Sequence, residues 1–190
     1  MNMSPSESTP LINIQWLLQR PWRLLAFGFG CGLSRLAPGT VGTLWAWAIA
    51  LVAQFLLANW SHLDVFILLF AGFLLGVWSC GNTGADLGIF DHSGMVWDEI
   101  IAFWLILFFI FPANWKVQLI AFILFRFFDI AKPGPIRYID AYFKTWLPKG
   151  FFGQWPRTVR GFGVMIDDLL ATFFTLLVLS IFSKLGLIHV

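Results

Sequence analysis

The chain has 190 residues, of which 59% are hydrophobic and only 12% are charged. A soluble domain carries about 25% charged residues, so this composition excludes an ordinary soluble enzyme and predicts an integral membrane protein. The formal net charge of +2 is too small to suggest a nucleic acid as partner. At this length we expect one domain, residues 1–190, whose active site must be built from helix ends and short loops.

The N-terminal segment 1–20 is predicted to be a flexible tail. Its first ten residues, MNMSPSESTP, contain no basic run before an apolar core, so we expect no cleaved signal peptide. The two cysteines, Cys31 and Cys80, lack a metal-type spacing and are predicted to be buried thiols rather than a disulfide.

Five apolar segments predict an all-α fold, a compact polytopic bundle of about five apolar helices. They cover approximately residues 41–58, 63–80, 96–113, 117–131 and 165–185. A helix needs about 20 residues to cross the hydrocarbon core, and several segments reach that length only with their charged ends included. Two alternatives follow: either those charges lie at or below the headgroups, or the shorter helices enter the membrane without crossing it.

Two further stretches are predicted to lie along the membrane surface. The segment after Lys132-Pro133-Gly134-Pro135 alternates an apolar and a charged stripe, which predicts an amphipathic helix in the plane of the interface. The stretch 148–160 mixes aromatic and basic residues and is expected to contact anionic headgroups.

Lysines and arginines predict the orientation, because cytoplasmic loops carry an excess of them. An N-terminus inside the cell puts nine of the twelve bases on the cytoplasmic side: Arg20, Arg23, Arg35, Lys132, Arg137, Lys144, Lys149, Arg157 and Arg160. The same orientation puts loops 28–43, 81–99 and 129–168 there, with every acid except Glu7 and Asp64. We therefore expect the chemistry to converge on the cytoplasmic face of the membrane.

Acidic residues at the ends of the apolar segments are the strongest functional signal. They are Asp98, Glu99, Asp129, Asp167 and Asp168, with Arg126 the only base among them. Ionisable groups at membrane depth are costly and are seldom kept without a function. Because Mg²⁺ prefers carboxylate oxygens, the surplus of acids predicts a Mg²⁺ site. The alternative is that each adjacent pair of acids answers the dipole of a helix N-terminus.

Three other features leave their own alternatives. Arg126 and Asp129 are three residues apart and share a helix face, so they form a structural pair, or Arg126 binds a phosphate or orients a carboxylate. The glycine-rich stretch 28–43 can hold an anion on backbone amides near Thr40 or Thr43, or can serve helix packing through small residues. Asp86, in a polar stretch, is a weaker candidate for a ligand or base.

Four strings together resemble the phosphatidylglycerophosphatase A family of bacterial membrane lipid phosphatases. FGFGCGLSRLAPGTVGT, DHSGMVWDE, FRFFDIAKPGPIR and GFGVMIDD occur in the family's order over most of residues 24–172. The resemblance implies Mg²⁺-dependent hydrolysis of phosphatidylglycerophosphate to phosphatidylglycerol and phosphate, at the cytoplasmic face of the bacterial inner membrane. Gly134 replaces the tryptophan of the family's KPWPIR motif, and the segment 140–161 is longer than the family leads us to expect.

The residues and the resemblance together predict three roles. Metal ligands are Asp98, Glu99, Asp129, Asp167 and Asp168; phosphate-binding residues are Ser34, Arg35, Thr40, Lys132 and Arg137; catalytic residues are Asp86, Asp167 and Arg126. We expect a metal-activated water to attack phosphorus, with Asp86, Asp167 or Asp168 as base, and an aspartyl-phosphate intermediate is the alternative. The alternative function is a cation- or proton-coupled transporter, whose polar groups would follow a whole crossing rather than stop at one face.

Overall fold

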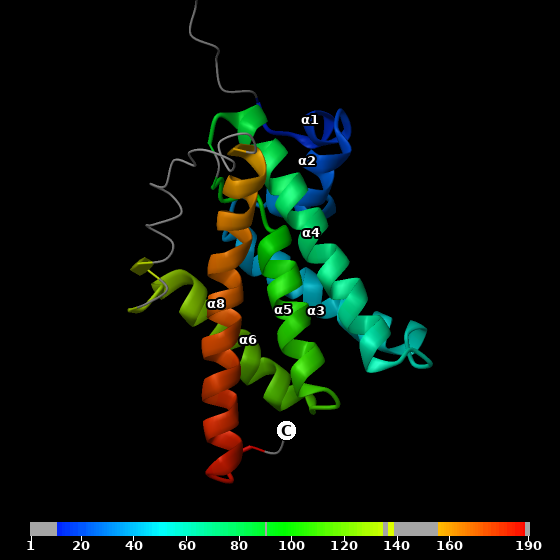
Figure 1. Cartoon of the computed structure of the whole chain (residues 1–190), viewed down its shortest axis with the longest axis vertical. Coiled ribbons are helices and arrows are strands. Elements are labelled where there is room, and N and C mark those ends of the chain that lie inside the picture. The colour runs from blue at the N-terminus through cyan, green and yellow to red at the C-terminus, as the bar shows by residue number, and fades with distance from the viewer. Residues whose placement is uncertain (1–10, 90, 135–136, 139–155, 189–190) are drawn as a thin grey trace, which may run out of the picture.

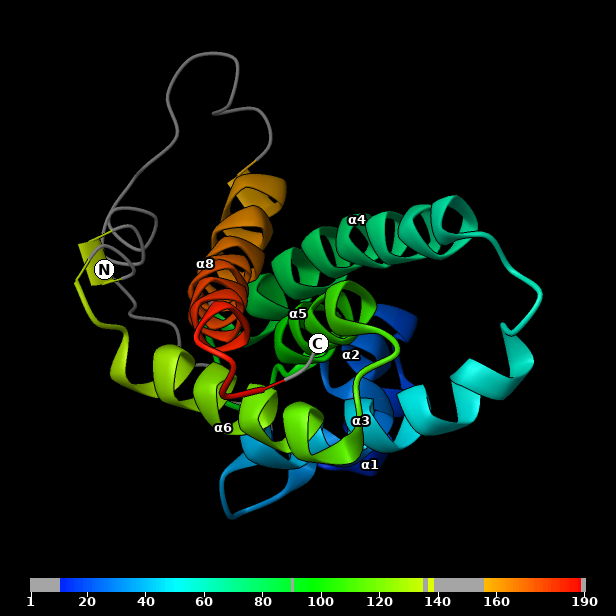
Figure 2. The same cartoon turned by 90° about the horizontal axis from the view of Figure 1, so that it is seen from below.

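The computed structural model describes residues 11–89, 91–134, 137–138 and 156–188, and these residues form helices and no strands. The elements are α1 (Ile14–Leu18), α2 (Pro21–Ala26), the 3-10 helix η1 (Gly28–Leu33), α3 (Pro38–Leu56), α4 (His62–Leu87), α5 (Trp97–Ile110), α6 (Trp115–Ala131) and α8 (Pro156–Lys184). Helix α5 contacts α3, α4, α6 and α8, so it forms the centre of the bundle (Figures 1 and 2). The predicted compact helical bundle is confirmed.

Three helices, α3, α4 and α8, are long and apolar enough to cross a membrane, judged by length and composition alone. They contain 19, 26 and 29 residues. Helices α5 and α6 have 14 and 17 residues, fewer than the roughly 20 that a full span needs. Which of the two predicted alternatives applies to these short helices stays a prediction.

Helices α4 and α8 are longer than predicted at the ends that carry polar residues. The sequence predicted a loop from residue 81 and the start of the last helix at 165, but α4 continues to Leu87 and α8 begins at Pro156. The reason is that Gly81 and Gly161 serve packing, not helix termination. A methyl group at position 161 would overlap the carbonyl of Val77, and one at position 81 would overlap that of Arg157. The two helices thus cross with their backbones in contact.

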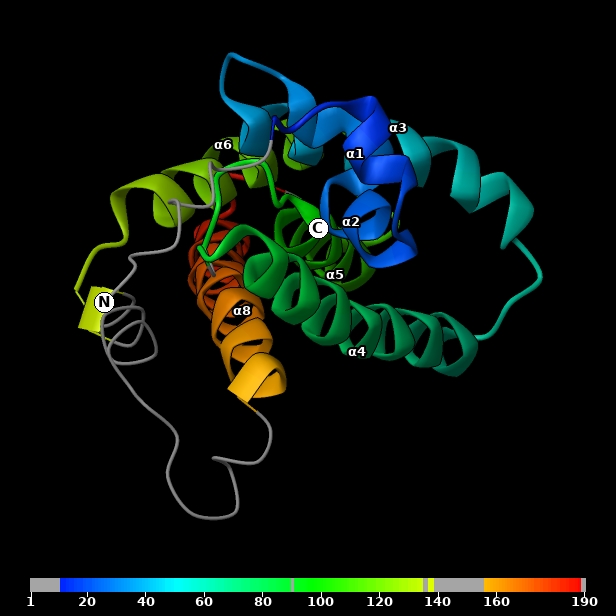
Figure 3. The same cartoon turned by 90° about the horizontal axis from the view of Figure 1, so that it is seen from above.

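The predicted N-terminal tail contains a helix. Asn13 begins α1 by accepting a hydrogen bond from the Trp16 amide at 2.9 Å, a regular N-cap interaction. Trp16 and Leu17 are buried in the core. Burial of these apolar side chains stabilises the segment, which the prediction of a flexible tail did not take into account. Helix α2 then packs against α4, with α1 beside it (Figure 3).

Most of the predicted surface helix and most of the stretch 148–160 lie outside the described residues; residues 137–138 are described and are helical. Within that stretch, residues 156–160 are the first turns of α8. Both cysteines are free thiols, as predicted, with Cys80 buried and Cys31 partly buried.

Candidate active site

Three carboxylates meet at the point where α5 begins and α8 passes it. One oxygen each from Asp98, Glu99 and Asp168 lie within 4.8 Å of one another. Asp98 is 9% exposed and Asp168 only 3%. We call these three residues the acidic cluster. It joins acids that are about seventy positions apart in the sequence.

The acidic cluster is poorly satisfied by the protein itself. Among the described residues, Glu99 Oε2 and Asp168 Oδ2 are buried without a hydrogen-bond partner. Asp98 Oδ1 accepts the neighbouring Glu99 amide, at 3.1 Å. A helix dipole stabilises a nearby acid by about 0.3–1 kcal/mol, which cannot offset the burial of several carboxylates. A set of buried, mutually repelling oxygen ligands fits a hard cation such as Mg²⁺.

Arg126 extends from α6 to the edge of the acidic cluster. Its Nη1 lies 2.6 Å from Asp129 Oδ2, on the same helix, and 3.6 Å from Glu99 Oε1 on α5. The Nε atom is buried and lacks a hydrogen-bond partner among the described residues. The predicted Arg126–Asp129 pair is therefore present, and the same guanidinium also faces a carboxylate of the cluster.

Lys132 and Asp167 form a second ion pair beside the acidic cluster. Lys132 ends α6 in a left-handed conformation, with φ of 40°, and its Nζ pairs with Asp167 Oδ2 on α8. The other oxygen of Asp167 accepts the Asp168 amide at 3.1 Å. The five predicted metal-site acids thus lie in one region: three in the cluster, and Asp129 and Asp167 paired with its flanking bases.

The first turn of α3 also adjoins the acidic cluster, through Gly39. A side chain at this position would overlap Glu99 Oε1 and lie 2.9 Å from Arg126 Nη2. Helix α3 has no side-chain cap at its N-terminus, and Thr43 instead donates back to the Gly39 carbonyl at 2.8 Å. The first amides of α3 are left for an anion, because a helix N-terminus has unpaired N–H groups. Sequence reasoning missed Gly39, whose signal was a glycine at a helix start.

The remaining predicted phosphate ligands are arranged less closely. Thr40 is in the first turn of α3 and is partly buried, whereas the Ser34 hydroxyl donates to the Leu36 carbonyl at 2.8 Å. Arg35 and Arg137 are exposed, and no ion pair in the described part of the chain joins either of them to the acidic cluster.

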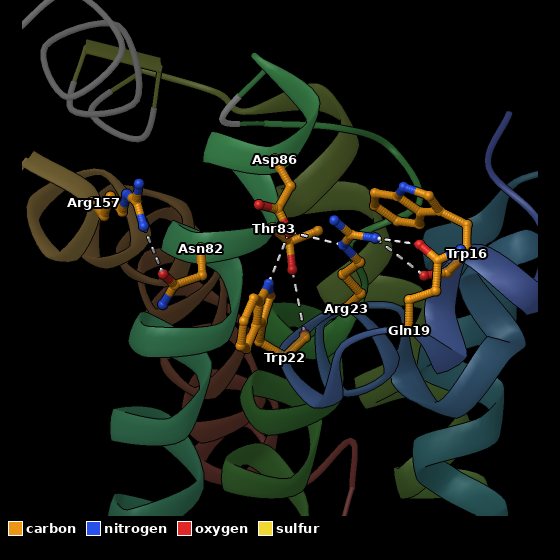
Figure 4. Close-up of polar contacts among 8 residues, drawn as sticks. All are labelled: Trp16, Gln19, Trp22, Arg23, Asn82, Thr83, Asp86 and Arg157. Carbon is orange, nitrogen blue, oxygen red and sulfur yellow. Dashed lines mark hydrogen bonds and ion pairs between the residues drawn. The ribbon is translucent and has the colours of Figure 1, made fainter. Parts of the chain in front are cut away.

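Asp86 is placed in a different group of residues, at the C-terminal end of α4. Its Oδ2 accepts hydrogen bonds from Arg23 Nε at 2.7 Å and Trp22 Nε1 at 2.9 Å (Figure 4). Asp86 is not among the described acids whose oxygens converge within 4.8 Å. Its role as base stays a prediction, and its partners on α2 were not foreseen because no helix was predicted over residues 21–26.

The fold and this site define a class: a helical membrane protein that holds a polar, carboxylate-lined site within an apolar bundle. A family model described as Phosphatidylglycerophosphatase A matches residues 24–183. The chain belongs to this family and is therefore an enzyme, a lipid phosphatase, as the four sequence strings predicted.

Two curated relatives agree with the family assignment. A Phosphatidylglycerophosphatase A of Haemophilus influenzae is 40% identical over 174 residues, covering 91% of this chain and 94% of the relative. A protein of the same name from Escherichia coli is 37% identical over 155 residues, covering 81% of this chain and 78% of the relative. No solved structure gives a significant match.

Proposed function

We propose that the chain hydrolyses the terminal phosphomonoester of phosphatidylglycerophosphate, releasing phosphatidylglycerol and inorganic phosphate. One observation carries the proposal: Asp98, Glu99 and Asp168 converge within 4.8 Å next to the guanidinium of Arg126. Carboxylates can hold a cation and the arginine can hold phosphate oxygens, which is the combination that a phosphomonoester requires. The names of both relatives specify this substrate.

Mg²⁺ is the proposed cofactor, held by Asp98, Glu99 and Asp168. The donor set supports it, because all three residues offer carboxylate oxygens, and Glu99 and Asp168 each have an oxygen that is buried without a partner among the described residues. Asp129 and Asp167 would support the site through Arg126 and Lys132. When bound, Mg²⁺ neutralises phosphate charge and lowers the pKa of water.

The phosphate group is proposed to lie beside the start of α3, within reach of the side chain of Arg126. Gly39 allows the α3 backbone to approach this position, and the uncapped amides of that turn suit an anion. Arg126 can hold two phosphate oxygens with its planar fork. Thr40 can add a hydroxyl donor, while Ser34, Arg35 and Arg137 would contact the headgroup farther from phosphorus.

Hydrolysis forms a bond from a water oxygen to phosphorus and breaks the ester bond to the glycerol oxygen. The water proton passes to a carboxylate, and the leaving glycerol oxygen takes up a proton, returned by that carboxylate or drawn from solvent, to become a hydroxyl group. Asp167 is better placed than Asp86 to accept the proton, since it neighbours Asp168 of the acidic cluster, whereas Asp86 lies outside the cluster. An aspartyl-phosphate on one of these carboxylates is the competing route.

The proposed location of the reaction is the cytoplasmic face of the inner membrane. The site lies at the start of α5, where α8 passes it, and Arg157 and Arg160 occupy the first turns of α8. On the α2 side, Arg20 and Arg23 flank the same region of the bundle. The positive-inside rule favours a cytoplasmic position for such a cluster of bases.

The direct test is phosphate release from phosphatidylglycerophosphate in mixed detergent micelles. The purified protein should release phosphate, lose this activity in EDTA and regain it with Mg²⁺. Asp168→Asn should lower the rate more than about 100-fold, because a metal ligand is lost. Asp64→Asn is the matched control, since it makes the same substitution at an acid that caps the N-terminus of α4. Absence of phosphate release by folded protein would overturn the proposed substrate. Turnover that resists EDTA would overturn the proposed metal requirement.

A further inference from the structure

Asp86 is bound by two donors from one short helix. Its Oδ2 atom accepts Arg23 Nε at 2.7 Å and Trp22 Nε1 at 2.9 Å, and both donors belong to α2 (Figure 4). One turn earlier on α4, the Thr83 hydroxyl donates to the Trp22 carbonyl at 3.3 Å. The last turns of α4 therefore bind two side chains and the backbone of α2.

Arg23 extends this contact to α1. Its Nη1 donates to the Trp16 carbonyl at 3.3 Å and to Gln19 Oε1 at 3.2 Å. The guanidinium also lies over the Trp16 ring, 4.2 Å from its centre, and its side chain is only 13% exposed. An isolated exposed ion pair contributes little to stability, but this one is part of a network with a shielded arginine.

The other end of α2 fixes the start of the helix that carries the acids. The Ala26 carbonyl accepts the Val96 amide at 2.9 Å, and Val96 is the residue that caps α5. Phe27 follows and is 1% exposed. At Gly28 a methyl group would lie 2.9 Å from Val96 and 2.8 Å from Ile100, so the two segments are in close contact.

We propose that Asp86 is a positioning residue: by holding α2 on α4, it sets the position of α5 and hence of Asp98 and Glu99. Those acids are two and three residues beyond Val96, whose amide is bound by α2. The proposal rests on the proposed function, because position matters there for the metal ligands. It replaces a proton-transfer role for Asp86, whose Oδ2 already accepts two hydrogen bonds and which lies outside the acidic cluster.

A double-mutant cycle distinguishes positioning from proton transfer. Asp86→Ala and Arg23→Ala should each lower kcat/KM about 10–100-fold, as expected for residues that support metal ligands. The double variant should be no worse than the poorer single variant within about threefold, because both changes break one linkage. Asp86→Asn should keep activity within about threefold, since its amide oxygen can still accept both hydrogen bonds.

A general base gives the opposite pattern. Asp86→Asn would then lose about 10²–10⁴-fold and would lose the acidic limb of the pH–rate profile. The fold losses in kcat/KM from Asp86→Asn and Arg23→Ala would also multiply in the double variant. Arg20→Ala is the matched control, because it removes a charge next to α2 from a residue that contacts the Trp22 ring and not Asp86. Either the multiplied losses or a severe Asp86→Asn defect would overturn the proposal.

Hydrogen exchange gives a second readout that does not depend on substrate or metal. The amides of residues 94–99 should exchange faster in Asp86→Ala and Arg23→Ala than in the wild type or Arg20→Ala, because the Val96 amide loses its fixed acceptor. Unchanged exchange there would overturn the proposal even if phosphatase activity were absent. If an alanine variant fails to fold, Trp22→Phe, which removes only the indole donor, serves for both measurements.

Discussion

The ammonium group of Lys132 is paired with the carboxylate of Asp167, which links the last residue of the α6 region to α8. Their side chains are 23% and 10% exposed, so the pair is largely shielded from water. Asp168, the next residue, belongs to the acidic cluster. A lysine that sequence analysis assigned to the incoming phosphate thus also orients α8 at the site.

We predict that Lys132→Ala lowers both kcat and thermal stability, rather than KM alone. Removing the lysine leaves Asp167 as a shielded charge without this partner, at a cost of about 1–3 kcal/mol in the free energy of unfolding. Thermal unfolding and micelle kinetics of Lys132→Ala, Asp167→Asn and the double variant measure the effect. Strictly additive losses in the double variant would contradict coupling of the two residues.

Mg²⁺ is expected to stabilise the folded protein. Binding to the native state alone contributes about 2.7 kcal/mol at a ligand concentration of 100 Kd. Millimolar Mg²⁺ should therefore raise the Tm of the wild type and of Asp64→Asn, but not that of Asp168→Asn or Glu99→Gln. The measurement is thermal unfolding in detergent after treatment with EDTA, and an equal shift in all four proteins would place the cation elsewhere.

Gly39→Ala should abolish phosphatase activity without preventing insertion or folding of α3. The added methyl group would overlap Glu99 Oε1 and approach Arg126, so it would separate α3 from the acidic cluster. Gly72→Ala is the control, because there the methyl group meets only the flexible end of Ile101, away from the acids. Rates of phosphate release, together with detergent gel filtration of both variants, test this. Wild-type activity in Gly39→Ala would show that the start of α3 is not part of the active site.

Arg126→Lys is expected to lower kcat strongly, by about 10²–10³-fold, because an ammonium cannot replace a planar two-donor contact in the transition state. KM should change less, and the melting temperature should stay near that of the wild type, since the lysine can still pair with Asp129. Surface-dilution kinetics separates kcat from KM. Normal kcat would assign Arg126 to structure alone.

Cysteine labelling tests the orientation. Single cysteines at Asn82 and Thr158 should react with an impermeant maleimide only from the cytoplasmic side, and one at Asn59 only from outside. Background labelling should be low because Cys80 is buried and because burial, reinforced by the charge of Glu99, raises the pKa of the Cys31 thiol to about 11. At pH 8 this leaves about 0.1% thiolate at Cys31. Labelling at Asn82 from outside would reverse the proposed orientation.

The bundle and the acids could be predicted because apolar length and charge are local properties of the sequence. Asp98, Glu99 and Asp168 were all identified from their places at the ends of apolar segments. Their grouping into one cluster depends on how α5 and α8 pack, which no local pattern encodes, whereas the Arg126–Asp129 pair follows from spacing along one helix. Gly81 and Gly161 were ambiguous for the same reason: a glycine can end a helix or admit a neighbouring one.

The N-terminal helices were the largest omission. Residues 14–18 form too short a helix to be stable alone, and α1 exists because Trp16 and Leu17 find a core to enter. Because α1 and α2 were not predicted, the sequence offered no partner for Asp86, and this acid was interpreted as a catalytic residue.

The close backbone contact between α4 and α8 at Gly81 and Gly161 fixes the position of α8 relative to α4. Asp168 is seven residues beyond Gly161, about 10 Å along the helix axis. A larger side chain at either glycine would move this carboxylate away from Asp98, so the spacing of the acidic cluster depends on two residues that carry no functional group.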